Sequence, residues 1–134
     1  MVVFNNPFFL EKDGPYIKHY PSGQIEMTGT IKNRKKDGFW EGFHENGQLR
    51  MRQNYKDGEQ HGSFEYFYNN GQLDFRGYYK DGKPNGLWEI YHGNGQLKWR
   101  INYQNGEYNG LRETFDESGN LTKSTEYKDG VLRE

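Results

Sequence analysis

Four histidines and a recurring glutamate are the side chains of this 134-residue sequence best suited to metal or acid–base chemistry. His44 and His92 occupy the same position in two units of a repeat, two units apart. The strand spacing of a β-sheet would then separate them by roughly 19 Å, too far for both to bind one metal ion. His19 falls at another strand position and His61 in a loop between units. We therefore interpret the histidines as solvated or half-buried, and predict no metal site.

The glutamates also recur, at one position per unit: Glu41, Glu65, Glu89 and Glu113. Paired carboxylates can act as acid and base, but neighbours in this row would lie about 10 Å apart, facing basic residues on adjacent strands. Structural ion pairing is the preferred interpretation. The chain has no cysteine and no nucleophile-elbow, zinc-protease, P-loop or dinucleotide motif. We expect a protein that is not an enzyme and needs no cofactor.

The frame that positions these residues is a repeat of 24 residues. Glycines recur at this spacing at 14, 38, 62, 86 and 110, and again at 23, 47, 71, 95 and 119. A third series lies at 58, 82, 106 and 130, with Arg34 in place of its first glycine. Such regularity defines a repeat protein. The predicted units are 14–37, 38–61, 62–85, 86–109 and 110–134, preceded by a segment, 1–13, that either folds over the open edge or is a partly ordered tail.

Each unit has the pattern of two strands. Leu49, Met51, Gln53 and Tyr55 alternate with polar residues, and the next two copies repeat the alternation. Period two over seven residues is typical of a half-buried strand. We predict an all-β fold, an elongated single-sheet antiparallel meander of β-hairpins with about ten strands.

Two registers are compatible with the hairpin loops, which end in Gly23, Gly47, Gly71, Gly95 and Gly119. A two-residue type I′ turn would place Glu41, Glu65 and Glu89 opposite Arg52, Arg76 and Arg100. A three-residue loop closed by a glycine bulge would instead pair Phe43 with Leu49 and Phe67 with Leu73. Pro21 and Ser22 suit the second loop better, so we favour it.

Composition restricts the partners. The chain is 31% hydrophobic and 17% aromatic, with a formal net charge of −1, which indicates a thin structure held by half-buried aromatic side chains and gives no general attraction to nucleic acid. No apolar run is long enough to span a bilayer. The N-terminus lacks the features of a signal peptide. We expect a cytoplasmic protein; the alternative is a secreted protein whose signal peptide has been removed from this sequence.

The motif Tyr-Lys-Asp-Gly-x-x-x-Gly followed by aromatic residues and Gly-Gln-Leu resembles the MORN-repeat family in its bacterial variant. The matching residues of one unit are Tyr55, Asp57, Gly58, Gly62, Phe64, Phe67, Gly71 and Leu73. The resemblance covers roughly residues 14 to 130. It implies an extended sheet of hairpins that serves as an interaction surface for proteins or, as an alternative, for anionic lipid. Proteins of this kind are commonly described as YwqK-type antitoxins, which implies a bound toxin as a second alternative.

Repetition also creates ladders of like side chains, and a one-layer sheet cannot bury both faces. An exposed aromatic ladder flanked by arginines is typical of the core of a protein interface. We predict a protein-binding or scaffolding module, or self-association, and little contact with membranes. The predicted contact residues are Trp40, Phe64, Trp88, Phe75 and Trp99, with Arg52, Arg76 and Arg100 at the rim. The alternative is that the aromatic side chains pack on each other and need no partner.

Overall fold

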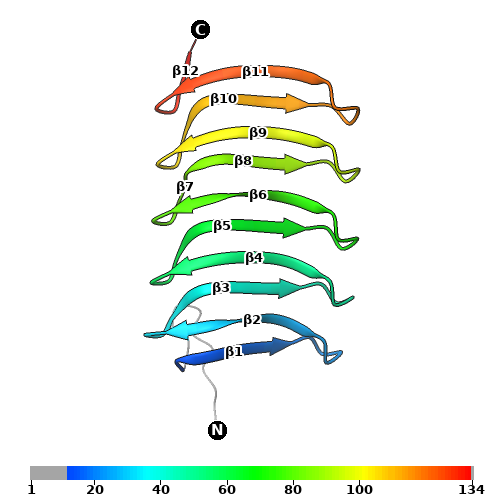
Figure 1. Ribbon diagram of the computed structural model, residues 1–134, viewed down its shortest axis with the longest axis vertical. Coiled ribbons are helices and arrows are strands. Elements are labelled where there is room, and N and C mark those ends of the chain that lie inside the picture. Colours follow the sequence, from blue (N-terminus) through cyan, green and yellow to red (C-terminus); the bar gives the residue numbers. More distant parts are fainter. Residues whose placement is uncertain (1–11, 134) are drawn as a thin grey trace.

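A computed structural model describes residues 12–133, all of whose regular elements are β-strands. The twelve strands form one open antiparallel sheet in which neighbours in sequence are neighbours in space (Figure 1). The order is β1-β2-β3-β4-β5-β6-β8-β9-β10-β11-β12, and the short β7 pairs with β6. The predicted all-β meander is confirmed. Its predicted cap or tail, residues 1–13, lies outside the described residues except for its last two.

The strands fall into five hairpins and a terminal stub. Their bounds are β1 Gly14–His19, β2 Ile25–Lys32, β3 Lys35–Phe43, β4 Leu49–Lys56, β5 Glu59–Phe67, β6 Leu73–Lys80, β7 Lys83–Pro84, β8 Gly86–Tyr91, β9 Leu97–Gln104, β10 Glu107–Phe115, β11 Leu121–Lys128 and β12 Val131–Arg133. Twelve strands replace the predicted ten, because β7 is separated from β8 and β12 begins a further hairpin.

Within each unit the strands are joined by the three-residue loop. In the second unit, His44 N–H donates to the carbonyl of Gln48, and Gly47 N–H donates to the carbonyl of His44. Gly47 has φ of 88°, whereas Asn46 does not reach positive φ. A type I turn closed by a glycine bulge has this geometry. The favoured loop is therefore confirmed.

The two registers described above as alternatives occur together. Phe43 faces Leu49 as the three-residue loop requires, yet Glu41 faces Arg52. A bulge between Gly42 and Phe43 absorbs one residue of the partner strand and shifts the register between the two pairs. Treating the pairings as mutually exclusive was wrong, because a hairpin need not keep one register along its whole length.

Consecutive units are joined by tight two-residue turns. Asp57 and Gly58 have φ of 51° and 82°, and Lys56 pairs with Glu59 on either side of them. Positive φ at both central residues defines the type I′ turn, whose twist matches that of the flanking strands. Glu59, Gln60 and His61 already belong to β5, so the connection is much shorter than the predicted polar loop. A second register shift lies between Gln53 and Tyr55 of β4, where the facing part of β5 contains Gly62.

The two faces of the sheet differ in chemistry. Alternation along each strand places the predicted aromatic residues on one face, the aromatic face, defined by Trp40, Phe64 and Trp88. The opposite face carries Glu41 and Arg52, which face each other on β3 and β4; we call it the charged face. The buried residues other than glycine lie on the aromatic face, and they are Ile31, Trp40, Met51, Gln53, Phe64 and Ile101.

Candidate functional site

A ladder of alternating charge crosses the charged face from β3 to β10. Successive strands contribute, in order, Glu41, Arg52, Glu65, Arg76, Glu89, Arg100 and Glu113, each paired in register with the next. One charged residue per strand, always at the same repeat position, produces a single row that reverses sign at every step.

Within this ladder the ion pairs do not follow the hairpins. Glu41 accepts from Arg52 at 3.3 Å, inside one hairpin as predicted. Arg76, however, bonds Glu89 of the next unit at 3.0 Å, although it also faces Glu65 within its own unit. The hydrogen bond from Arg76 to Glu89 raises the pKa of this guanidinium above its ordinary value. The ladder thus links units to one another, and an arginine with acids on both sides can pair with either.

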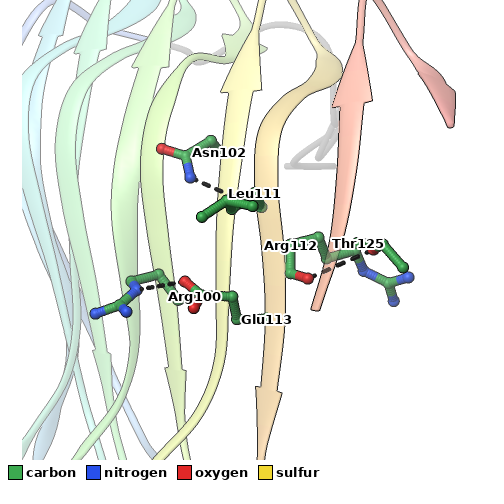
Figure 2. Close-up of polar contacts among 6 residues, drawn as sticks. All are labelled: Arg100, Asn102, Leu111, Arg112, Glu113 and Thr125. Carbon is green, nitrogen blue, oxygen red and sulfur yellow. Dashed lines mark hydrogen bonds and ion pairs between the residues drawn. The ribbon is translucent and has the colours of Figure 1, made fainter. Parts of the chain in front are cut away.

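Figure 2 shows the same arrangement one unit further along. Arg100 Nε of β9 donates to Glu113 of β10 at 3.0 Å, and Asn102 donates to the carbonyl of Leu111 at 3.0 Å. The carboxylate side of this ion pair is largely covered, because the side chain of Glu113 is only 14% exposed. The side chain of Arg100 keeps 40% of its surface accessible. The arginines of the ladder are therefore accessible to a partner, whereas Glu89 and Glu113 are mostly covered.

Exposed apolar side chains lie two residues from the ladder on the same face. Phe39 is 56% exposed, Tyr78 42%, Leu87 46% and Leu111 45%. Phe39, Leu87 and Leu111 share one repeat position, and Tyr78 lies beside them on β6, facing Ser63 of β5. This row was not predicted from the sequence, because the serine at position 63 interrupts it and the larger aromatic ladders are more conspicuous.

A shallow depression of about 270 Å³ interrupts the charged face over β5, β6 and β8. It is lined by Ser63, Phe64, Glu65, Arg76, Gly77, Leu87 and Glu89. Gly77 contributes no side chain, so the middle of β6 is thin here. The depression combines an apolar wall from Leu87 with the charged groups of the ladder.

The predicted aromatic contact residues are more buried than expected. Trp40 is 1% exposed and Phe64 2%, while Trp88, Phe75 and Trp99 are half-buried. Trp40 lies 5.2 Å from Tyr16 between ring centroids, and Phe64 lies 4.7 Å from Trp88. The expectation of an exposed aromatic ladder is wrong for Trp40 and Phe64, because the rings pack along the sheet on their neighbours, as the alternative held.

The predicted arginines do not rim these aromatic residues. Arg52 follows Met51, Arg76 follows Phe75 and Arg100 follows Trp99 directly in their strands. Successive side chains of a strand point to opposite faces. The arginines therefore lie on the charged face and the aromatic residues on the other, so the eight predicted residues cannot form one contact surface.

Tryptophan on the aromatic face is matched to glycine on the preceding strand. A Cβ built on Gly77 would lie 2.6 Å from Cδ1 of Trp88, and Trp88 Nε1 donates to the carbonyl of Tyr78 at 3.0 Å. Trp40 relates in the same way to Gly29. Where the partner is larger, as at Gln53, the ring is the smaller Phe64. Ring size and the facing residue thus compensate each other.

A second row ties each hairpin to the next through polar side chains. Tyr20 and Tyr68 donate from their hydroxyls to the carbonyls of Phe43 and Tyr91, at 2.6 and 2.9 Å. His44 Nε2 donates to the carbonyl of Phe67 at 2.9 Å. His92 does the same with Phe115 at 3.0 Å. The two candidate metal ligands are thus structural donors.

Both rows alternate with a period of two units. Tyrosine and histidine alternate in the polar row, and glycine faces tryptophan in every second hairpin, at Trp40 and Trp88. The true structural repeat is therefore 48 residues, twice the glycine period. The sequence contained this signal, but the invariant glycines and Gly-Gln-Leu motifs obscured it.

The last unit replaces the ring by Arg112, at the position of Trp40, Phe64 and Trp88. Its guanidinium carbon lies 5.3 Å from the ring centroids of Trp99 and Tyr108, a cation–π arrangement. The Nε atom is buried and has no hydrogen-bond partner among the described residues. In Figure 2 this side chain extends away from the Arg100–Glu113 pair. Arg112 thus continues the packing of the aromatic face.

Two kinds of site are absent from the part of the chain that the structure describes. Within 12–133, no group of three or more histidine, cysteine or acidic side chains could hold a metal ion. Over the same residues, no helix has the length and apolar character needed to cross a membrane.

The five hairpins are hydrogen-bonded to one another in the order of the chain, and the sheet leaves two open faces. This arrangement is that of a solenoid-like repeat protein. The chain belongs to the MORN repeat variant family, whose pattern matches residues 12–33, 36–57, 60–83, 84–105 and 108–129. Each match begins two residues before a predicted unit. No curated protein matches the chain. MORN repeats generally serve as modules that bind proteins or membranes.

Proposed function

We propose that the protein is a non-enzymatic protein-binding module and that the charged face carries the contact. The observation behind this proposal is the row of exposed apolar side chains beside the ladder, in which Tyr78, Leu87 and Leu111 each keep more than 40% of their surface accessible. Apolar anchors beside arginines are typical of interface cores. The structural roles of His44 and His92 as carbonyl donors support a function without catalysis.

The alternating charges of the ladder favour a protein partner over a membrane surface. Anionic lipid attracts clusters of uncompensated lysine and arginine. Here every arginine of the ladder has a glutamate in register on each side. A partner protein with its own polar and charged groups can match such alternation, whereas a uniformly negative surface cannot. Neutralisation of a toxin is a narrower form of the same proposal, with the toxin as the bound protein.

Affinity capture from a cell extract tests the proposal. The bait proteins are the wild type, a charged-face variant Tyr78→Asp, and a control variant Leu121→Asp. Leu121 is likewise exposed, at 54%, but lies near the end of the sheet, on β11. We expect the control to recover the same proteins as the wild type and Tyr78→Asp to lose them. Equal recovery by all three baits would refute a contact through the charged face.

A further inference from the structure

The alternation of the ladder makes the charged face complementary to itself, and we propose that its partner is a second copy of this chain, bound face to face about a twofold axis between β6 and β8. This inference rests on the proposed function and names its partner. The contact would join Arg76 and Glu89 of one copy to Glu89 and Arg76 of the other, with Leu87 of each copy seated in the depression of its partner.

The charges require that the axis lie between two neighbouring strands, and the exposed apolar groups select β6 and β8. An axis parallel to the strands exchanges strands at equal distance on its two sides. An axis lying on a strand would place each glutamate over a glutamate and each arginine over an arginine, because the sign reverses at every strand. An axis between β6 and β8 places Arg76 over Glu89, Glu65 over Arg100 and Arg52 over Glu113. The six ladder charges from Arg52 to Glu113 then each meet an opposite charge, whereas Glu41 on β3 lies over β11, where Ser124 holds the ladder position.

The same axis brings the apolar groups together. β6 of one copy lies over β8 of the other, so Tyr78 faces Leu87 across the axis on both sides. The depression over β5, β6 and β8 lies next to Tyr78, between Ser63 and Gly77, so the Leu87 side chain of the second copy would enter it beside Tyr78. A leucine side chain fits within its volume of about 270 Å³. Two symmetric apolar insertions surrounded by charge pairs form the anchored centre and polar rim of a typical interface.

The charged face is large enough to form a stable dimer interface. Eleven strands in register, at about 4.8 Å each and about 20 Å wide, present on the order of 1,000 Å² on one face. A standard interface needs about 800 Å² per partner. Stacked sheets cross at about 30°, so the overlap is best at the centre of the molecule. The proposed axis runs close to that centre, beside the sixth of the eleven paired strands.

Around the axis, four charges would form a square of alternating sign. Arg76 already bonds Glu89 of its own chain at 3.0 Å, and each group would gain a second opposite charge from the other copy. Charge complementarity of this kind mainly fixes orientation and register, and like charges brought together at an interface cost several kcal/mol. Reversing the charge of Arg76 or Glu89 should therefore turn attraction between the two copies into repulsion.

The decisive experiment exchanges the two charges. In a homodimer, Arg76→Glu leaves four acidic side chains around the axis, and Glu89→Arg leaves four basic ones. Sedimentation equilibrium of full-length protein should show a wild-type dimer, and each variant alone should raise the dissociation constant at least about tenfold. An equimolar mixture should regain the wild-type constant, because the acidic pair of one variant then faces the basic pair of the other. No recovery on mixing would overturn the proposal.

A matched pair of leucine variants tests the axis without altering the ladder. Leu87 and Leu111 share one repeat position and are 46% and 45% exposed, but Leu111 lies two strands from β8. Leu87→Asp should weaken the dimer at least about tenfold, and Leu111→Asp less than about threefold. Equal effects would overturn the placement of the axis. A wild type that is monomeric at all concentrations would overturn self-association, whereas the proposed function fails only if Tyr78→Asp captures the wild-type set of proteins.

Discussion

Substitution of Gly77 by alanine tests the matching of glycine to tryptophan. Gly77 lies in β6, where its φ is not positive, so alanine adopts the backbone without strain. In an open strand, alanine would be the more stable residue by about 0.5–1 kcal/mol. Here the new methyl group would lie 2.6 Å from Cδ1 of Trp88, and overpacking of this kind costs about 1–3 kcal/mol. The clash outweighs the gain.

We therefore expect Gly77→Ala to lower the free energy of unfolding by about 1–2 kcal/mol. Urea denaturation followed by circular dichroism measures this change directly. The same substitution in a Trp88→Phe background removes much of the clash, as Phe64 tolerates the larger Gln53 facing it. In that background the effect should fall to within about 0.5 kcal/mol of zero or become stabilising. An equal loss in both backgrounds, or stabilisation of the wild type by alanine, would refute the reasoning.

Three further changes test the turns, the polar row and the buried tyrosines. Arg34→Gly should raise the free energy of unfolding by about 0.5–1 kcal/mol, because Arg34 has φ of 61°, a conformation that glycine adopts without strain; a lower melting temperature would contradict this. His44→Ala should lower the free energy of unfolding by about 1 kcal/mol, because it deletes the hydrogen bond to the carbonyl of Phe67. His44→Tyr should recover most of that loss in the same urea titration, since a tyrosine makes the equivalent bond at position 68. Identical losses in the two variants would show that the bond is not the cause. Stability should fall as pH rises above about 10, because burial raises the pKa of five tyrosines above 10.0. The unfolded chain then releases protons that the folded chain retains. Absorbance titration at about 295 nm should show these tyrosines ionising later than in urea, and coincident curves would contradict the shift. The tyrosines concerned are Tyr55, Tyr68, Tyr79, Tyr91 and Tyr103.

The architecture was predictable because it depends on short-range rules. Alternation predicted the strands, and glycine spacing predicted the units. Pro21 and Ser22 indicated the three-residue loop that the hydrogen bonds of Gly47 confirm in another copy. The bulge at Gly42 was not predicted, because a register shift depends on two strands at once. That shift allows both the loop and the Glu41–Arg52 pair to form.

The candidate site was harder to predict than the fold. The prediction assigned the arginines and the aromatic residues to one surface. Arg76 directly follows Phe75 in the chain, however, and adjacent residues of a strand point to opposite faces of the sheet. Burial of Trp40 depends on the missing side chain of Gly29 on the neighbouring strand, a relation between two units that inspection of one unit does not reveal. Comparing alternate units would have shown it, together with the histidine–tyrosine alternation.

The order of the sheet has a consequence for how the chain folds. Every major pairing joins strands adjacent in sequence, so closing each hairpin fixes only a short loop. Sheet proteins usually fold slowly because their strands meet across long stretches of chain. This one should fold quickly for an all-β protein, starting at any hairpin and growing outward, with a nucleus favoured where the rings of Phe64, Tyr79 and Trp88 meet. Its outermost hairpins should exchange their amide hydrogens first.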